Sequence, residues 1–271
     1  MAKISDTERI KFNNLTSAYR EATETLLKKE KEMRKIIEQK APDSAFKRID
    51  LADEMLNLAS NYLVINGVSQ SVQNLRSEDA LNEARKTLYK SVIYLEEVVS
   101  SSIDAPFSDY EEQLDVIESF TPAKRFYLIR KLGLAIHLLE NAYGDNTKWK
   151  WSFVELEGRF AAVTKNMLDL RAIRVNTDPR SPHYEPTILH LRLARKLLMQ
   201  AADRYREKYE LSTNRIDDFK KGILFLTALI RLNMLTDAQL DAASVKKKLE
   251  IWKNKLNADI GKMDTMAGKK G

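Results

Sequence analysis

Residues 149–170 read WKWSFVELEGRFAAVTKNMLDL. The large apolar residues of this stretch recur with alternating spacings of four and three, which is the period of an amphipathic helix and not of a strand. The members of this row are Trp149, Phe153, Leu156, Phe160, Val163, Met167 and Leu170. The stretch therefore predicts a helix whose inner row begins at Trp149 and packs into a core.

Trp151 lies about 200° around the same helix from Trp149. Its side of the helix also carries Val154, Gly158 and Ala161. A glycine inside a helix costs stability relative to alanine, so Gly158 indicates a close approach by another element. We expect Trp151 to face a second helix of this chain; the alternative is that it binds a protein partner.

The helical period recurs along most of the chain, and the 8 glycines and 6 prolines fall mostly between the periodic segments. No segment shows the period-two alternation of a strand. We therefore predict an all-α fold of about eight mostly long amphipathic helices, arranged as an antiparallel bundle or an irregular α-solenoid. Eight of the expected helices span roughly residues 5–41, 44–66, 77–98, 122–143, 149–170, 186–211, 215–235 and 236–260, and a short acidic helix begins at about residue 108.

Four of these helices carry more specific expectations. The first opens with a Ser5-x-x-Glu8 capping box, and the last opens with Thr236-x-x-Gln239. Gly67 is expected just past the end of the second helix. The helix over 122–143 is apolar on nearly all sides, so it is predicted to be the most buried element.

The first helix also carries a row with heptad-like spacing, which makes self-association plausible. Lys29 fills one position of this row. The apolar members are Leu15, Tyr19, Ala22, Leu26, Met33 and Ile36. A homo-oligomer is therefore one of the expected partners, and a constant solution mass of 31.2 kDa would reject it.

The proline-rich segment at 175–186 is the best internal boundary. It divides an N-terminal helical region, 1–174, from a C-terminal helical region, 187–261, that packs on it. The two regions can also form one continuous domain. Residues 262–271 are expected to be a frayed tail.

The sequence lacks the motifs of several large enzyme classes. With no cysteine it can form no disulfide, thiolate nucleophile or Cys-ligated metal site. It contains no Gly-rich phosphate loop, no G-x-S-x-G, no H-E-x-x-H and no Glu-x-x-His. We therefore expect no cofactor, no metal and no enzymatic activity. No apolar run is long enough to span a bilayer or to act as a secretory signal, so a cytoplasmic protein is expected.

Two groups of histidines are weak candidates for chemistry. His137 could form an acid–base pair with Glu140, but a buried, hydrogen-bonded histidine is favoured. His183, Glu185 and His190 bracket a helix start and could hold a metal. Two imidazoles without a recurring ligand spacing favour instead a loop residue and a residue on a helix flank.

Charge is unevenly distributed. Residues 91–123 contain no Lys or Arg, and the acidic side chains from 104 to 118 are interpreted as a solvated helix face, with Ca²⁺ or a basic partner as alternatives. Residues 246–271 hold eight lysines against three acidic residues, which accounts for most of the net charge of +6. In the last helix, five lysines lie beside an apolar row: Lys246, Lys247, Lys248, Lys253 and Lys255.

These lysines could bind nucleic acid or another anionic surface, although lysines near a helix C-terminus more often complement the helix dipole. Arg195, like Lys29, interrupts an apolar row and could anchor an anionic ligand or pair with a facing carboxylate. The predicted function is a non-enzymatic helical interaction or scaffold protein that binds another protein through a groove or helix seam. The alternative is an anionic-surface binder that uses the last helix.

Overall fold

The computed structural model describes residues 4–39, 43–144 and 147–267, with side chains as far as residue 262. Within them the chain forms ten α-helices and no strand, so the all-α prediction is confirmed. A 3-10 turn (Phe107–Asp109) and a π-helical turn (Tyr209–Thr213) complete the elements. The helices are α1 (Asp6–Glu38), α2 (Ser44–Gln73), α3 (Glu78–Val98), α4 (Glu111–Val116), α5 (Pro122–Tyr143), α6 (Lys150–Asn166), α7 (Ile173–Asn176), α8 (Tyr184–Lys208), α9 (Ile216–Leu235) and α10 (Gln239–Ala267).

The chain divides into two compact units. Unit 1 comprises Met1–Ser100, Asp115–Phe120 and Tyr127–Lys150, and so holds α1, α2, α3 and most of α5. Unit 2 comprises Ser101–Leu114, Thr121–Phe126 and Trp151–Gly271, and so holds α6 to α10.

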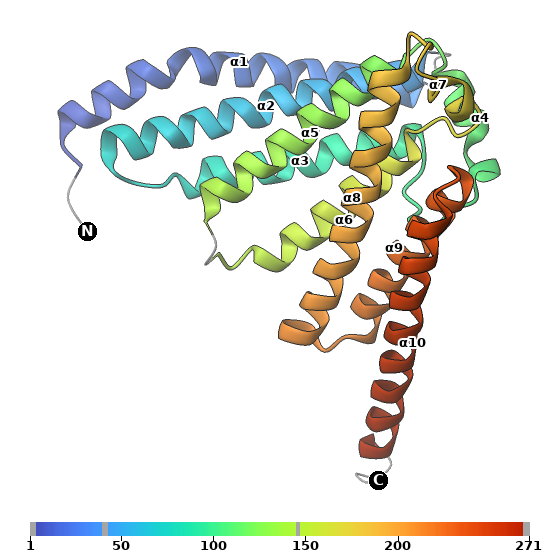
Figure 1. Ribbon diagram of the computed structural model, residues 1–271. Helices are drawn as coiled ribbons and strands as arrows, with labels where there is room; N and C mark the ends of the chain where they lie inside the picture. The colour runs from blue at the N-terminus through green and yellow to red at the C-terminus, as the bar shows by residue number, and fades with distance from the viewer. Residues whose placement is uncertain (1–3, 40–42, 145–146, 268–271) are drawn as a thin grey trace. The chain divides into compact units, whose positions relative to one another are not determined.

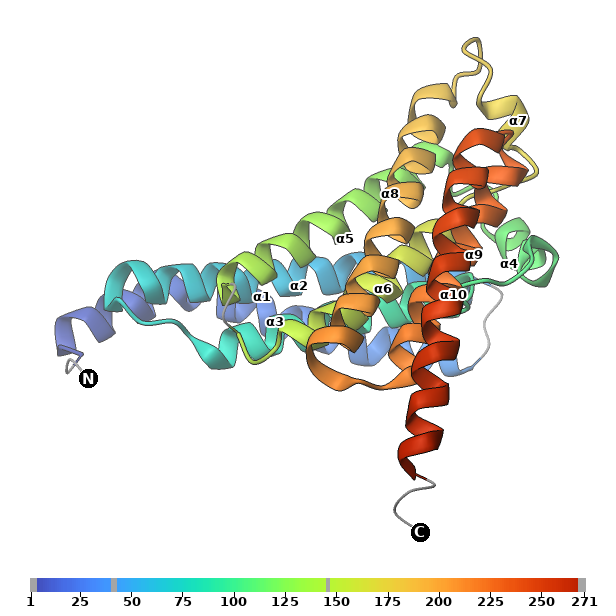
Figure 2. The same ribbon diagram turned by 60° about the horizontal axis from the view of Figure 1, so that its bottom comes forward.

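In unit 1, α1, α2 and α3 run side by side and reverse direction at each connection (Figure 1). The α2 helix contacts both of the others, and its fully buried side chains include Leu51, Met55 and Leu56. Figure 2 shows the same antiparallel arrangement from a second direction. Burial of large aliphatic side chains is what stabilises such a layer of helices.

The α1 helix confirms its predicted start, because Ser5 and Glu8 form both hydrogen bonds of a capping box. The predicted inner row is wrong: none of its six apolar members is buried, and four of them are exposed. The structure buries Thr16, Thr23, Glu30 and Ile37, each one residue after a predicted member, and leaves Leu15 and Ile36 exposed. The buried side of α1 therefore lies about 100° around the helix axis, the angle of one residue, from the side predicted by the sequence. Burial of Glu30 accompanies this rotation, because its carboxylate is satisfied by Lys90 and Tyr94 of α3.

Two further expectations about unit 1 are wrong. Gly67 lies inside α2, which continues to Gln73 and ends at Asn74 in the left-handed conformation (φ 52°). The α5 helix is not buried on all sides, since Tyr127, Leu134 and Leu138 are exposed. Residue type alone does not bury a helix face; a neighbouring element must cover it.

In unit 2, α8, α9 and α10 also alternate in direction (Figure 1). The ring of Phe219 on α9 packs against Tyr209 at 5.0 Å and against Trp252 of α10 at 5.8 Å between centroids. Thr236 does not begin α10 as predicted. It ends α9, where its hydroxyl donates to the carbonyl of Leu232, and α10 begins at Gln239. The predicted frayed tail begins within α10, and residues 268–271 lie outside the described part of the chain.

Candidate interaction surfaces

Trp151 packs inside unit 2, in agreement with the preference for a neighbour in the same chain. It is half-buried and lies against the apolar core that includes Val154 and Ala161. Gly158 is the close approach that the sequence indicated, because a β-carbon at this position would lie 2.7 Å from Tyr205 of α8. Trp151 is thus a packing residue first, and its binding role stays a prediction.

Trp149 belongs to unit 1, where it is half-buried rather than fully in the core. The guanidinium carbon of Arg85 lies 4.0 Å from the centre of its indole ring. A cation over an aromatic face contributes about 0.5–2 kcal/mol, depending on desolvation. Trp149 therefore holds α3 to the segment that precedes α6.

Arg195 is half-buried on α8, and its Nη2 donates to the Thr236 hydroxyl at the end of α9 (2.6 Å). Burial lowers the pKa of Arg195, and the nearby carboxylate of Asp241 opposes that effect. The guanidinium links α8 to the end of α9, and this contact occupies one of the donors that an anionic ligand would use.

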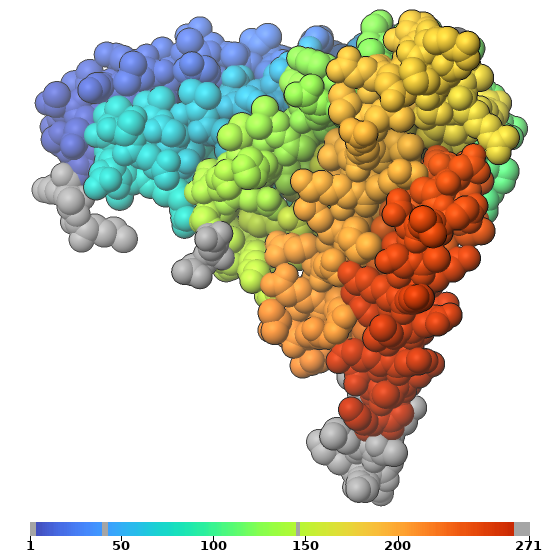
Figure 3. All heavy atoms as spheres, viewed as in Figure 1, coloured from blue at the N-terminus to red at the C-terminus, as the bar shows by residue number. Residues whose placement is uncertain are grey.

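The α10 lysines separate into two groups. Lys248 pairs with Asp203 (2.6 Å) and Lys255 with Glu210 (3.5 Å), so both hold α10 against its neighbours in unit 2. Lys246, Lys247 and Lys253 are exposed, and none of the three takes part in an ion pair within the described residues. Of the five lysines, only this second group is exposed and, within the described part of the chain, outside an ion pair; α10 is the red helix of Figure 3.

The most exposed row of large apolar side chains lies on α5 and was not predicted. Tyr127, Leu134 and Leu138 are 68%, 58% and 46% exposed, and their spacings of seven and four place them on one side of the helix. We call these three residues the α5 face. A contiguous exposed apolar row on a helix is typical of an interaction site, whereas isolated exposed apolar residues need no explanation.

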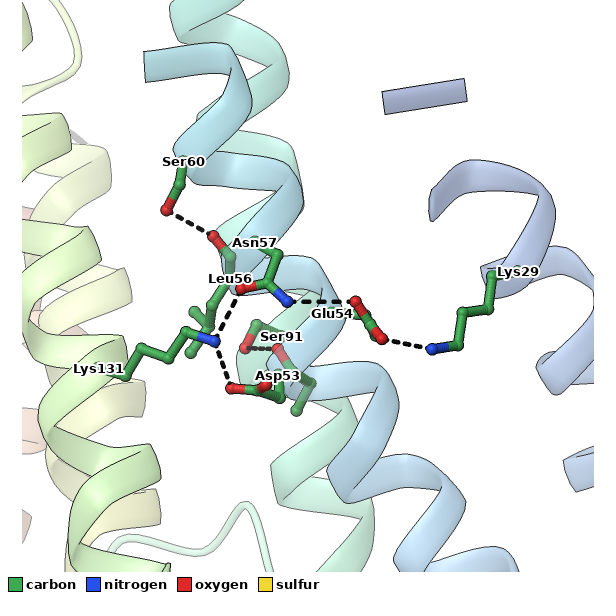
Figure 4. Close-up of polar contacts among 9 residues, drawn as sticks. Lys29, Asp53, Glu54, Leu56, Asn57, Ser60, Ser91 and Lys131 are labelled. Atoms are coloured by element: carbon green, nitrogen blue, oxygen red, sulfur yellow. Dashed lines mark hydrogen bonds and ion pairs between the residues drawn. The ribbon is translucent and has the colours of Figure 1, made fainter. Parts of the chain in front are cut away.

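A chain of polar contacts attaches α5 to α2 beside the α5 face, because Lys131 lies one turn after Tyr127 on nearly the same side of the helix (Figure 4). Lys131 donates to Asp53 (2.6 Å) and to Asn57 (2.8 Å) of α2. Asn57 in turn donates to Glu54, whose other oxygen pairs with Lys29 of α1. Burial would raise the pKa of Glu54, but the hydrogen bonds from Lys29 and Asn57 lower it below its usual value. Lys29 therefore has a facing carboxylate as its partner.

A groove of about 470 Å³ lies between α1 and α3 of unit 1. At its base the buried carboxylate of Glu30 accepts from Lys90 and from the hydroxyl of Tyr94, both at 2.9 Å. Burial and this hydrogen bond raise the pKa of Tyr94. At the rim, Arg48 pairs with Glu97 (2.9 Å). Because these charges are paired with one another, the groove has no net preference for an anion or a cation.

Unit 2 contains a buried polar centre at the end of α6. Lys165 is buried, its Nζ lies 5.4 Å from the ring centre of Tyr110, and burial lowers its pKa to about 8. Asp104 opposes this shift and forms a two-pronged ion pair with Arg231 (2.9 and 3.2 Å). Asp104 thus belongs to an internal network and not to a solvated helix face. No sequence pattern singled out Lys165, because a lysine in an amphipathic helix normally lies on the exposed side.

His137 and His190 lie in environments opposite to those expected from the sequence. His137 is exposed, with its Nε2 3.0 Å from the amide nitrogen of Asn141, so the prediction that it is buried is wrong. His190 is buried, and its Nε2 donates to the carbonyl of Thr164 (2.9 Å), because a carbonyl oxygen can only accept. Burial lowers the pKa of His190 to about 4, so the ring is neutral at pH 7.

Residues 8–260 match the sequence profile of the TP0443 family. The chain belongs to the TP0443 family. No curated protein and no solved structure shows significant similarity to it. The region that defines this TP0443 family member extends from α1 into α10, so the surfaces described above lie largely within it.

The described residues of this TP0443 family member lack two further kinds of functional feature. In that part of the chain, His, Asp and Glu side chains do not gather in groups of three or more that could hold a metal ion. Over the same residues no helix combines the length and the apolar character required to cross a membrane. The features that remain as candidates for function are the surfaces of α1, α5 and α10.

Proposed function

We propose that this protein is a non-enzymatic interaction protein that binds an amphipathic helix of another protein along the α5 face. The observation that carries the proposal is the row of Tyr127, Leu134 and Leu138, which stays exposed although the other side of α5 is buried. Partner helices commonly bind through apolar residues spaced three, four and seven apart. The α5 face has that spacing and needs no change of fold to accept such a helix.

The proposal is tested by replacing Leu134 with a photo-crosslinking amino acid in the source cell. Cross-linking to one defined protein is expected. The matched control carries the same group at Val175, an isolated apolar residue on α7 that is 70% exposed. Equal yields of the same product from both positions would contradict a specific α5 site.

A variant with Leu134→Glu and Leu138→Glu completes the test. Both side chains already lie in solvent, so stability should change by less than about 0.5 kcal/mol. Binding should fall at least about a hundredfold, because two charges would be buried in the interface without partners. Unchanged affinity in a folded double variant would reject the α5 face as the binding surface.

The exposed lysines of α10 favour a second function, binding to nucleic acid or an anionic surface. Changing Lys246, Lys247 and Lys253 to Ala should weaken such binding. It should also make the slope of log K against log salt concentration shallower by at most about three, roughly one for each lysine removed. The control is Lys248→Ala with Lys255→Ala, which removes lysines already paired with Asp203 and Glu210. If the control variant loses as much affinity as the triple variant, the α10 surface is not the cause.

A further inference from the structure

The outer side of α1 carries a second row with spacings of four and three, distinct from the row that packs against α2 and α3. Each of its eight members is exposed. We call it the outer row; its members are Lys11, Leu15, Ala18, Ala22, Thr25, Lys29, Glu32 and Ile36. The row forms one narrow exposed strip along 26 of the 33 residues of α1, and four of its eight members are apolar.

The middle of the outer row is small and the apolar residues lie toward its ends. Ala18, Ala22 and Thr25 occupy the middle, and the Thr25 hydroxyl already donates to the carbonyl of Glu21 (3.0 Å). Leu15 and Ile36 are 49% and 40% exposed. Small central residues allow two helix backbones to approach closely.

The charges of the outer row indicate which partner fits it. Lys29 is paired with Glu54, so the unpaired charges are Lys11 near one end and Glu32 near the other; neither is in an ion pair within the described residues. The midpoint between these two positions falls beside Ala22. In a parallel pair of α1 helices Lys11 would lie beside Lys11. In an antiparallel pair Lys11 of each helix lies near Glu32 of the other, so opposite charges meet twice.

We infer that α1 pairs in an antiparallel manner with α1 of a second copy of this chain, through the outer row and with Ala22 near the two-fold axis. The contact is self-complementary, as a two-fold interface requires. This contact uses no residue of the α5 face, so α1 pairing and partner binding at α5 can occur independently of each other.

Engineered thiols test this arrangement directly, because the chain contains no cysteine. Ala22→Cys should form a disulfide-linked dimer under mild oxidation, since residues at the two-fold axis face their own copies. Ala18→Cys and Thr25→Cys should cross-link when mixed and should do so poorly when each is alone. Lys31→Cys, on the other side of α1, is the matched control and should stay uncrosslinked.

Charge exchange gives an independent measurement. Lys11→Glu alone and Glu32→Lys alone should each raise the dimer dissociation constant about tenfold or more, and the double exchange should restore it. Sedimentation should show about twice the 31.2 kDa of one chain for the unmodified protein. A single-chain mass at every concentration overturns the proposal. So does efficient self-cross-linking of both Ala18→Cys and Thr25→Cys, which would indicate a parallel pair.

Discussion

His190 shows how one buried residue links fold and pH. Its Nε2 donates to the Thr164 carbonyl, its ring centre lies 6.1 Å from that of Phe126, and the positive charge of Arg125 adds to the effect of burial on its pKa. Burial lowers its pKa from 6.5 to about 4. Between these two values the unfolded chain binds more protons than the folded chain, so the stabilisation present above pH 6.5 is lost as the pH falls toward 4.

The predicted result is a loss of roughly 2–3 kcal/mol of unfolding free energy between pH 7 and pH 4.5 that depends on His190. His190→Gln keeps a donor for the Thr164 carbonyl but binds no proton, so its stability should fall less over the same range. Urea titrations at the two pH values measure the difference. His137→Gln is the control, because His137 is exposed, and it should keep the full pH dependence of the unmodified chain. Identical profiles for H190Q and the unmodified protein would contradict the assignment.

At the scale of elements, the sequence predicted where helices lie far better than which side each one buries. Capping at Ser5 is a local feature, and the close approach at Gly158 is marked by the glycine itself; both are confirmed. The buried side of α1 depends on whether Lys90 and Tyr94, about 60 residues away, can satisfy Glu30. The exposed side of α5 depends on which helices cover it. Neither fact is present in the local period, because an apolar row shows that a face exists and not what covers it.

The candidate surfaces follow the same rule. Composition places five lysines of α10 in one group, and only the positions of Asp203 and Glu210 separate the two paired lysines from the three exposed ones. The α5 face was missed because a helix apolar on nearly all sides is normally buried. Its exposure depends on which helices cover α5 in the assembled fold. The only signal in the sequence is that α5 has more apolar sides than its neighbours can cover.

At the scale of the whole molecule, the two compact units make a prediction about α6. A boundary at the proline-rich segment 175–186 groups α6 with the N-terminal helices, whereas the compact units place it with α8, α9 and α10. Core-weakening substitutions separate these alternatives. Trp252 in unit 2 and Leu88 in unit 1 are both almost fully buried, and replacing either with Ala should cost about 2–5 kcal/mol.

Hydrogen exchange measured by mass spectrometry then reports which helices loosen together. In Trp252→Ala we expect faster exchange in α8, α9, α10 and α6, with α1 to α3 changed least. In Leu88→Ala we expect the reverse, with α6 remaining protected. Protection of α6 that falls with Leu88→Ala and not with Trp252→Ala would instead support the boundary at 175–186. Equal loosening of all helices in both variants would show that the chain unfolds as one cooperative unit, because a substitution in either core would then destabilise every helix to the same extent.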